Sequence, residues 1–215
     1  MSLFSPELEN YLERFALQAD THPHLRIMEK FALETQFPII GPQVGQLLYL
    51  LAKMIGAQRV FEFGSGFGYS AYWFAKAIPQ DGKIFCTECS AQNEVLAHNN
   101  FQKLGITNVI DYCIGWSEEL FAQTSGEFDI IFNDVNKEFY PRMFELAAPR
   151  IVSGGLYIAD NTLWNGRVAQ TLTGQDPKAI TTKAVQEHNE MVLAHSDFES
   201  ILLPVRDGVL VARRK

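Results

Sequence analysis

The segment Arg59-Val60-Phe61-Glu62-Phe63-Gly64-Ser65-Gly66-Phe67-Gly68-Tyr69-Ser70 joins a short apolar run to a loop that contains three glycines. Glycine residues let a backbone turn tightly and approach a ligand without clashing side chains. In open α/β sheets, the turn after the first strand lies near the point where the strand order reverses, and ligands bind there. The segment therefore predicts a strand, a ligand-binding loop and the start of a helix.

Further short apolar runs follow this loop and alternate with longer helical patterns; they are Lys83–Cys86, Asn108–Ile110, Phe128–Phe132 and Leu156–Ala159. Strands that alternate with helices predict parallel strands joined by right-handed crossovers. Near the end, residues 199–204 and 209–212 flank Arg206-Asp207-Gly208, a turn signal that predicts an antiparallel edge hairpin. The chain is thus expected to form an α/β fold with a doubly wound, mostly parallel seven-stranded sheet.

The residues before the first expected strand predict helices. Apolar residues recur at helical spacing between Leu8 and Phe15, after the cap and first-turn pair Ser5-Pro6, and helical patterns also cover residues 25–35 and 44–55. No internal repeat, linker or charge run divides the chain. We therefore expect one domain at residues 1–215, with an N-terminal helical cap at residues 1–42 and a cofactor-binding core at residues 43–215.

The composition is that of an ordinary folded protein, with 215 residues of which 47% are hydrophobic and 20% charged. A net charge of -7 would on average repel a phosphate backbone, so we expect no nucleic-acid partner. The N-terminal residues lack the basic and apolar regions of a signal peptide, and no apolar run is long enough to span a bilayer. Three cysteines fit reduced thiols. These observations predict a cytoplasmic protein without a membrane partner.

Two acids distinguish the glycine loop from a dinucleotide-binding loop. The dinucleotide pattern G-x-G-x-x-G would need glycine where Tyr69 stands. Glu62, inside an apolar strand, is unexpected beside a pyrophosphate and suits a ligand with a positively charged amino group. Glu88 ends the second expected strand about 20 residues further on, where a carboxylate can accept hydrogen bonds from both ribose hydroxyls. The loop and its two acids favour a nucleoside without phosphate; the alternative is a plain tight turn, with Glu88 as a helix cap.

Polar residues also follow the next two strands of the expected core. Asp134 ends one strand and Asp160-Asn161 end the following one, so all three should face the same rim as the glycine loop. Two carboxylates and an amide oxygen suit Mg²⁺ and leave positions for water or substrate oxygens. Lys137 follows Asp134 by three residues, and an amine beside such a cation can lose its proton and act as a general base. The alternatives are that Asp134 and Asn161 cap the helices that follow them and that Lys137 is a solvated surface lysine.

These residues together resemble the class I S-adenosylmethionine (SAM)-dependent methyltransferases, and more narrowly the cation-dependent O-methyltransferases that include the catechol and caffeoyl-CoA enzymes. The likeness runs from about Phe37 onward. Its blocks are Gly45–Leu48, Glu62–Ser70, Phe128–Lys137, Gly154–Gly166 and Leu203–Gly208. The glycine loop alone indicates the superfamily, whereas Asp134 with Lys137, and Asp160-Asn161, indicate the metal-using branch.

The resemblance implies a Rossmann-like methyltransferase fold and a set of site residues. The implied catalytic residues are Lys137, as general base, and Asp134. The implied cofactor-binding residues are Ile40, Gly41, Glu62, Gly64, Ser65, Gly66, Tyr69, Ser70, Glu88, Gly115, Trp116, Ser117 and Asp134. The implied metal ligands are Asp134, Asp160 and Asn161, for Mg²⁺ or alternatively Ca²⁺ or Mn²⁺. Trp116 stands where family members often have a small residue, and Asn136 where many have a second acid.

By resemblance, the expected activity is methyl transfer from SAM to a hydroxyl of a small aromatic vicinal diol, of catechol or caffeoyl type, by a homodimer. The acceptor pocket is expected to involve the N-terminal segment and residues 165–179. Phe139, Tyr140 and Trp164 could wall a planar acceptor, or equally pack in the core or form a dimer contact. A non-catalytic SAM-binding protein and an NAD-dependent oxidoreductase remain alternatives. Cys86-Thr87-Glu88-Cys89 has C-x-x-C spacing, but without a second such pair neither a zinc nor a redox role is expected.

Overall fold

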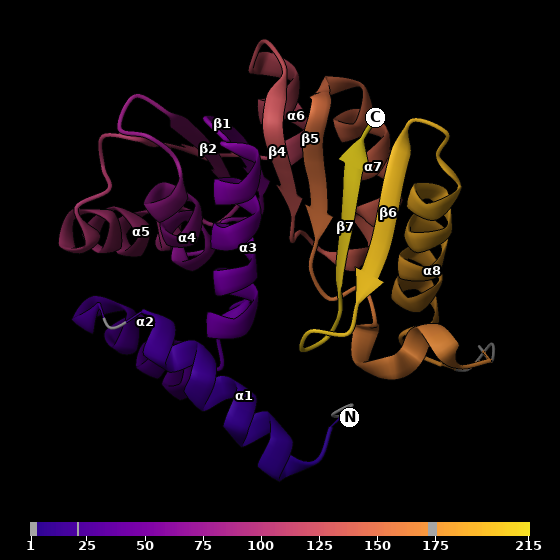
Figure 1. Cartoon of the computed structure of the whole chain (residues 1–215), viewed down its shortest axis with the longest axis horizontal. Helices are drawn as coiled ribbons and strands as arrows, with labels where there is room; N and C mark the ends of the chain where they lie inside the picture. Colours follow the sequence, from indigo (N-terminus) through magenta and orange to yellow (C-terminus); the bar gives the residue numbers. More distant parts are fainter. Residues whose placement is uncertain (1–3, 21, 172–175) are drawn as a thin grey trace.

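One mixed β-sheet forms the centre of the computed structural model, which describes residues 4–20, 22–171 and 176–215 (Figure 1). Within these residues, seven strands pair in the order β3-β2-β1-β4-β5-β7-β6. The strands are β1 (Arg59–Phe63), β2 (Lys83–Glu88), β3 (Ile110–Ile114), β4 (Phe128–Asn133), β5 (Ile151–Ala159), β6 (Phe198–Leu203) and β7 (Val209–Arg214). The strands from β3 to β5 pair in parallel, and β7 runs antiparallel to both β5 and β6. The predicted doubly wound sheet with an antiparallel edge hairpin is confirmed.

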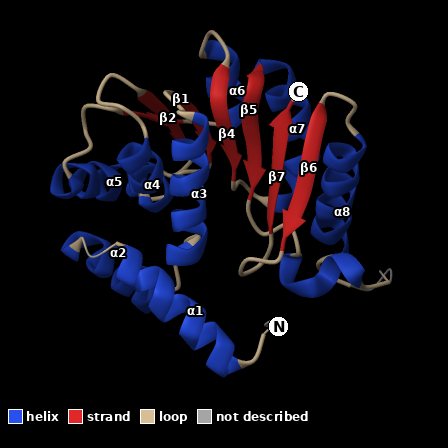
Figure 2. Ribbon diagram, in the orientation of Figure 1, coloured by secondary structure: helices blue, strands red, loops and turns tan. Residues whose placement is uncertain are grey.

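Helices cover both faces of this sheet (Figure 2). The α-helices are α1 (Pro6–Ala19), α2 (Pro23–Thr35), α3 (Gly41–Ile55), α4 (Tyr69–Ala77), α5 (Ala91–Leu104), α6 (Ser117–Gln123), α7 (Tyr140–Ala147) and α8 (Ala179–Ala194). In the described part of the chain, the short 3-10 helices are η1 (Lys137–Phe139), η2 (Ala148–Arg150) and η3 (Trp164–Ala169).

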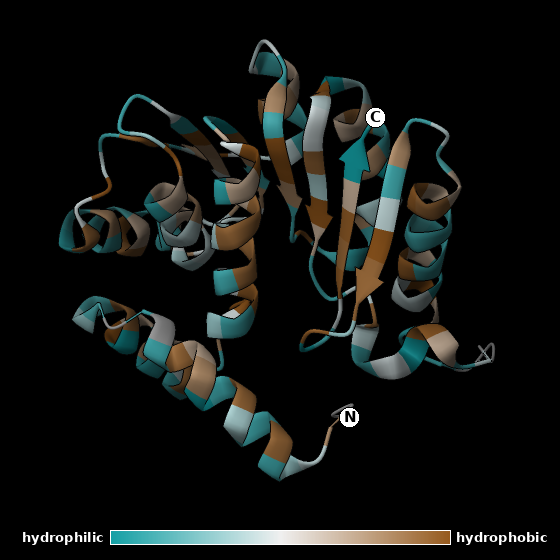
Figure 3. Ribbon diagram, in the orientation of Figure 1, coloured by the Kyte–Doolittle hydropathy of each residue, from teal (hydrophilic) through white to brown (hydrophobic). Residues whose placement is uncertain are grey.

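Two hydrophobic clusters lie on opposite faces of the sheet because side chains alternate along a strand. Val60 joins the cluster with α3, α4 and α5, whereas its neighbour Phe61 joins the cluster with α6, α7 and α8. In Figure 3 the hydrophobic colour covers much of β4 and of α3, while α8 alternates between hydrophobic and hydrophilic residues. The glycine loop after β1 is therefore held between two packed layers.

The predicted N-terminal helices are present as α1, α2 and α3. The Ser5 hydroxyl caps α1 by accepting a hydrogen bond from the Leu8 N–H, as its position before Pro6 indicates. Helix α3 ends at Gly56, which adopts the left-handed conformation that favours glycine. The division into a cap at residues 1–42 and a core at residues 43–215 stays a prediction. Among the described residues, none of the helices has the length and apolar character that crossing a membrane requires.

The third expected strand is the clearest error of position. Residues 108–110 were expected to be extended, but residues 107–109 form a turn and β3 starts at Ile110. Val109 lies in this turn with its side chain buried, so its apolar character reflects packing in the core and does not indicate a strand. The strand itself is hard to detect because β3 lies at the edge of the sheet, where Asp111 is exposed and its neighbours are only partly buried.

The cysteine pair of β2 lacks the features of a redox site. Cys86 is buried in the strand, and burial raises the pKa of its thiol well above the ordinary value. Cys89 is exposed just after the strand, and partial burial also raises its thiol pKa. Redox-active cysteines instead have lowered pKa values in electropositive surroundings.

A buried carboxylate connects the N-terminal helices to α4. Asp20, which follows α1, accepts hydrogen bonds from Lys76 Nζ and from the Tyr72 hydroxyl, both at 2.8 Å. The Asp20 side chain is only 5% exposed. Burial alone would raise the pKa of this carboxyl, but the bonds from Lys76, the His22 N–H and Tyr72 lower it below its ordinary value. Because α4 begins at the glycine loop, the cap is joined directly to the helix that follows the loop.

Asp20→Ala is expected to lower the free energy of unfolding by about 2 kcal/mol, because the partly buried Lys76 ammonium group loses its ion-pair partner. Denaturant unfolding followed by circular dichroism measures this. Glu34→Ala is the matched control, since Glu34 pairs with Lys30 where both side chains are more than half exposed. Its cost should stay within about 0.5 kcal/mol. Equal losses in the two variants would show that Asp20 does not hold the cap.

Candidate functional site

The sheet brings three polar strand ends to one rim. The Asp134 N–H donates to Phe63 O at 3.0 Å, and the Asp160 N–H donates to Asn133 O at 3.2 Å. These bonds continue the β1–β4 and β4–β5 pairings, so the glycine loop, Asp134 and Asp160 follow one another along the rim. The strand order reverses at β1, where ligands bind in open α/β sheets. The expected shared rim is present.

A cavity of about 670 Å³ opens at this rim, within the usual range for small-molecule sites. Most of the predicted site residues line it: Ile40, Gly64, Ser65, Gly66, Tyr69, Ser70, Glu88, Trp116, Ser117, Asp134, Lys137, Asp160 and Asn161. Gly41, Glu62 and Gly115 are not part of its lining. The segment from Phe37 to Ile39 lines the cavity as well, although no local motif pointed to it.

The glycine loop adopts a backbone that requires glycine. Gly64, Gly66 and Gly68 have φ values of 82°, 51° and 88°, in the left-handed region that other residues rarely adopt. A Cβ on Gly64 would lie 2.7 Å from the backbone oxygen of Asp134. The glycine therefore lets the loop pack directly against the end of β4, where the predicted catalytic residues begin.

Glu88 lies beside this loop with its carboxylate held by the backbone. Its two oxygens accept hydrogen bonds from the N–H groups of Gly66, at 3.0 Å, and Ser90, at 2.8 Å. The hydroxyl of Tyr69, in contrast, donates to Glu29 of α2 at 2.8 Å. The Tyr69 side chain thus joins the loop to the N-terminal cap.

Glu62 is fully buried at the end of β1, directly below the loop. Burial raises the pKa of its carboxyl to about 7, although the hydroxyls of Ser65 and Ser70 and the Cys86 thiol oppose this. Among the described residues, its Oε1 atom has no hydrogen-bond partner. A buried carboxylate with an oxygen left without a partner is costly, so a cationic group placed near it would be favourable. This environment fits the expected ligand amino group.

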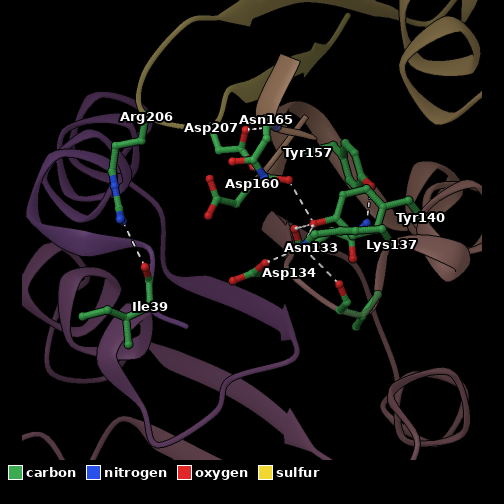
Figure 4. Close-up of polar contacts among 11 residues, drawn as sticks. Ile39, Asn133, Asp134, Lys137, Tyr140, Tyr157, Asp160, Asn165, Arg206 and Asp207 are labelled. Atoms are coloured by element: carbon green, nitrogen blue, oxygen red, sulfur yellow. Dashed lines mark hydrogen bonds and ion pairs between the residues drawn. The ribbon is translucent and has the colours of Figure 1, made fainter. Parts of the chain in front are cut away.

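Lys137 is held among three oxygens at the start of η1 (Figure 4). Its Nζ donates to Asp134 Oδ1 at 3.0 Å, to the Tyr140 hydroxyl at 2.8 Å and to Val135 O at 3.3 Å. The side chain is only 10% exposed, which excludes the alternative of a solvated surface lysine. The Tyr140 hydroxyl in turn donates to Asp160 O at 2.9 Å. The amine is therefore positioned between the two acids of the rim.

The acids of this rim form an arrangement that favours a bound cation. Burial raises the pKa of both Asp134 and Asp160, and the Asp134 charge raises that of Asp160 further. Asp160 Oδ1 is buried without a hydrogen-bond partner in the described part of the chain. Asn161 follows with a φ of 53° and lines the same cavity. Two carboxylates and an amide oxygen, with one oxygen unsatisfied, fit a hard divalent cation.

The carboxylates alone do not make up a metal site. Across residues 4–20, 22–171 and 176–215, no group of three or more His, Cys, Asp or Glu side chains could hold an ion. The predicted set contains only two such residues, because its third member is Asn161. A metal at this rim would therefore depend on the asparagine and on oxygens from water or substrate.

The aromatic residues near the site have different roles. Phe139 and Trp164 line the cavity, as expected for residues that could wall a planar acceptor. Tyr140 does not line it: its ring is fully buried against His188, and its hydroxyl faces Lys137. Trp116 is 60% exposed, and its ring centroid lies 6.5 Å from that of Phe139. The mouth of the cavity is thus aromatic. Of the expected acceptor segment, residues 172–175 lie outside the described residues.

A buried polar chain behind the site was not predicted. Asn133 Nδ2 donates to the Tyr157 hydroxyl at 2.9 Å, and this hydroxyl lies 2.8 Å from His188 Nε2. His188 Nδ1 lies 3.1 Å from Asn189 Oδ1, and Asn189 Nδ2 donates to Thr162 O at 2.8 Å. The network assigns the neutral tautomer with its proton on Nδ1. Spacing along the sequence could not identify this chain, because its members come from β4, β5 and α8.

Burial lowers the pKa of His188 from 6.5 to about 4. Between these values the unfolded chain binds a proton that the folded chain does not, so lowering the pH favours unfolding. The pKa of the buried Glu62 carboxyl is raised instead, and its protonation favours folding over the same pH range. The contribution of His188 is therefore measured as a difference: between pH 7.5 and pH 5, the free energy of unfolding of wild type should fall by about 2 kcal/mol relative to that of His188→Gln. Denaturant titrations at both pH values measure it. His98→Gln, at a half-exposed histidine, should follow wild type; an equal pH dependence in wild type and His188→Gln would refute the assignment.

Comparisons with known proteins agree on one family. A family model described as O-methyltransferase matches residues 16–215. Caffeoyl-CoA O-methyltransferase 1 from Eucalyptus globulus is 34% identical over 182 residues, which cover 79% of this chain and 72% of that protein.

Solved structures share the fold at lower identity. The O-methyltransferase TomG from Streptomyces achromogenes, involved in tomaymycin synthesis and solved with SAM, has a TM-score of 0.86 at 24% identity and covers 99% of this chain and 100% of its own. An O-methyltransferase from Bacillus cereus solved with SAH has a TM-score of 0.85 at 21% identity, with 95% and 97% covered. Both support the sheet order and its helical layers.

Proposed function

The chain belongs to the O-methyltransferase family, and on that basis we propose that it moves the methyl group of SAM to a hydroxyl of a small aromatic vicinal diol, of catechol or caffeoyl type, with the help of a divalent cation. One observation carries this proposal. Lys137 Nζ donates hydrogen bonds to Asp134 and to the Tyr140 hydroxyl, which in turn donates to the backbone oxygen of Asp160. The cavity that Lys137 lines is also lined by the glycine loop and Glu88. The proposed base, the two acids and a loop suited to a nucleoside therefore line the same cavity.

The cofactor would be bound by the loop side of the cavity. Glu88 would hold the ribose hydroxyls with a carboxylate that the backbone already orients. Trp116 and Ser117 would flank the adenine, and the loop of Gly64, Ser65, Gly66 and Ser70 would approach the methionine part. The Glu62 carboxylate, buried below this loop, would favour the positively charged amino group of the methionine part.

The cation would be held by Asp134, Asp160 and Asn161, with Mg²⁺ as the first candidate and Mn²⁺ or Ca²⁺ as alternatives. Such an ion supplies a Lewis acid that lowers the pKa of an acceptor hydroxyl and fixes its position. The unsatisfied Asp160 Oδ1 supports this assignment.

Lys137 would accept the proton that leaves the acceptor hydroxyl. Its three contacts keep the amine at the rim, where it donates all three of its protons. It would have to lose one of these protons before it could act as the base, and a neighbouring divalent cation would favour that loss. Phe139 and Trp164 both line the cavity and would hold the planar ring.

The test is a methyl-transfer assay with labelled SAM and a panel of catechol, caffeate and caffeoyl-CoA, with and without Mg²⁺. Transfer that needs both a vicinal diol and the cation supports the proposal. Transfer that persists in chelator, or equal use of a monophenol, would contradict it. Calorimetric titration of SAM against NAD separates the alternatives: tight NAD binding would favour an oxidoreductase, and SAM binding without any turnover would favour a non-catalytic protein.

Assembly and location extend the same proposal. We infer a homodimer that uses α1, since Tyr11 and Phe15 are 55% and 67% exposed on this helix. Light scattering on the eluting protein should give twice the monomer mass, and Phe15→Glu should reduce it. A cytoplasmic location stays a prediction.

A further inference from the structure

The turn between β6 and β7 lies between the two halves of the cavity. On one side it holds the segment that carries Asn161: the N–H of Thr162 donates to Gly208 O at 3.0 Å, and that of Leu163 to Asp207 O at 2.8 Å. The Asp207 carboxylate also accepts a hydrogen bond from the Asn165 N–H. The proposed metal side of the cavity is therefore fastened to this turn.

The residue before Asp207 points the other way (Figure 4). Arg206 Nη1 donates to Ile39 O at 3.0 Å, across 167 positions of sequence. The guanidinium lies directly on Gly41, where a Cβ would come within 2.9 Å of Arg206 Cζ. Ile39 and Ile40 line the cavity from the connection between α2 and α3. One turn thus contacts both walls of the cavity through two adjacent side chains.

Arg206 holds this position at a conformational cost. Its φ is 49°, in the left-handed region that disfavours residues with a side chain. The side chain is exposed, and among the described residues it forms no direct ion pair, although its charge lowers the pKa of Asp134, Asp160 and Asp207. Neither the backbone conformation nor a direct ion pair therefore explains an arginine here. The hydrogen bond to Ile39 and the contact with Gly41 do.

We propose that Arg206 is a positioning residue of the cofactor site, which fastens the wall at Ile39–Gly41 to the turn that also holds the opposite wall. These contacts of Arg206 keep the cavity at its width before a ligand binds, so that less of the binding free energy is spent on ordering the wall. The inference rests on the proposed function, because it assigns SAM to this cavity. It goes further in making the affinity for SAM depend on a residue outside the cavity lining.

The first test is calorimetric titration of SAM and of its product SAH into Arg206→Ala. We expect about tenfold weaker binding, as for the loss of one charge-assisted hydrogen bond. The KM for SAM should rise by about the same factor, while kcat at saturating SAM stays within about twofold. Arg206→Lys keeps a donor and should lose less. The control is Arg213→Ala, which removes the same charge from β7, where Arg213 is 55% exposed and pairs with Glu199; its SAM affinity should not change.

A second variant separates positioning from stability. Arg206→Gly suits a φ of 49°, so its melting temperature should stay within about 3 °C of wild type. It should nevertheless lose SAM affinity about as much as Arg206→Ala. Wild-type affinity in both variants, or a loss that simply follows the melting temperature, overturns the inference. If the wild-type protein itself binds no SAM, the proposed function fails and this inference with it. If wild type binds SAM and both Arg206 variants bind it equally well, only the positioning role of Arg206 is wrong.

Discussion

Asp134→Ala is expected to lower kcat/KM for methyl transfer by about a thousandfold. The residue has two proposed tasks, as a metal ligand and as the ionic partner of Lys137 at 3.0 Å. Its removal leaves Lys137 Nζ with only neutral oxygens, those of Val135 and Tyr140. Initial rates with saturating SAM and Mg²⁺ measure the loss. Calorimetric titration with Mn²⁺ should show binding weakened by at least about a hundredfold.

Two further variants make this result specific. Asp160→Asn should also lose most of the activity and Mn²⁺ binding, although no hydrogen bond joins the Asp160 side chain to Lys137 among the described residues; this separates the metal role from the lysine contact. Asp81→Ala removes an equal charge from the exposed turn before β2 and should stay within about twofold of wild type. Activity in Asp134→Ala within tenfold of wild type, unchanged by chelator, would refute the metal site.

Lys137→Met is expected to lower kcat by about a thousandfold, the usual scale for loss of a general base. Methionine keeps much of the length of the side chain and fills the same space, so the KM for SAM should change by less than about threefold. Rapid-quench measurement of a single turnover separates the chemical step from product release.

The matched control for this lysine is Lys103→Met, which removes a charge from the exposed face near the end of α5. Its kcat should equal that of wild type. If Lys137→Met retains a tenth or more of the wild-type kcat while binding SAM normally, the lysine only pairs with Asp134, and another group takes the proton.

Much of the fold could be predicted because its signals are local. The apolar run at β1 and the three glycines after it lie within twelve consecutive residues, and the structure shows them as strand, loop and helix. The edge strand β3 was misplaced for the opposite reason: at the edge of a sheet, one face is partly solvated and the apolar pattern weakens.

The candidate site was predictable where it follows strand ends. Asp134 and Asp160 were expected on one rim because parallel strands end on the same side, and the backbone bonds along β1, β4 and β5 bear this out. For Tyr140 the sequence left a cavity wall and core packing open, and the structure decides for the core, because its ring packs against His188.

The sequence by itself determined the strand–loop–helix at residues 59–77, the alternation that makes the sheet doubly wound, and the polar residues at its strand ends, because each of these depends on neighbours along the chain. Only the tertiary structure decided that Glu62 is fully buried, that Lys137 lies among three oxygens, and that Arg206 reaches Ile39. Burial and hydrogen bonding depend on which distant segments pack together, and a guanidinium that crosses 167 positions of sequence leaves no trace in the local pattern.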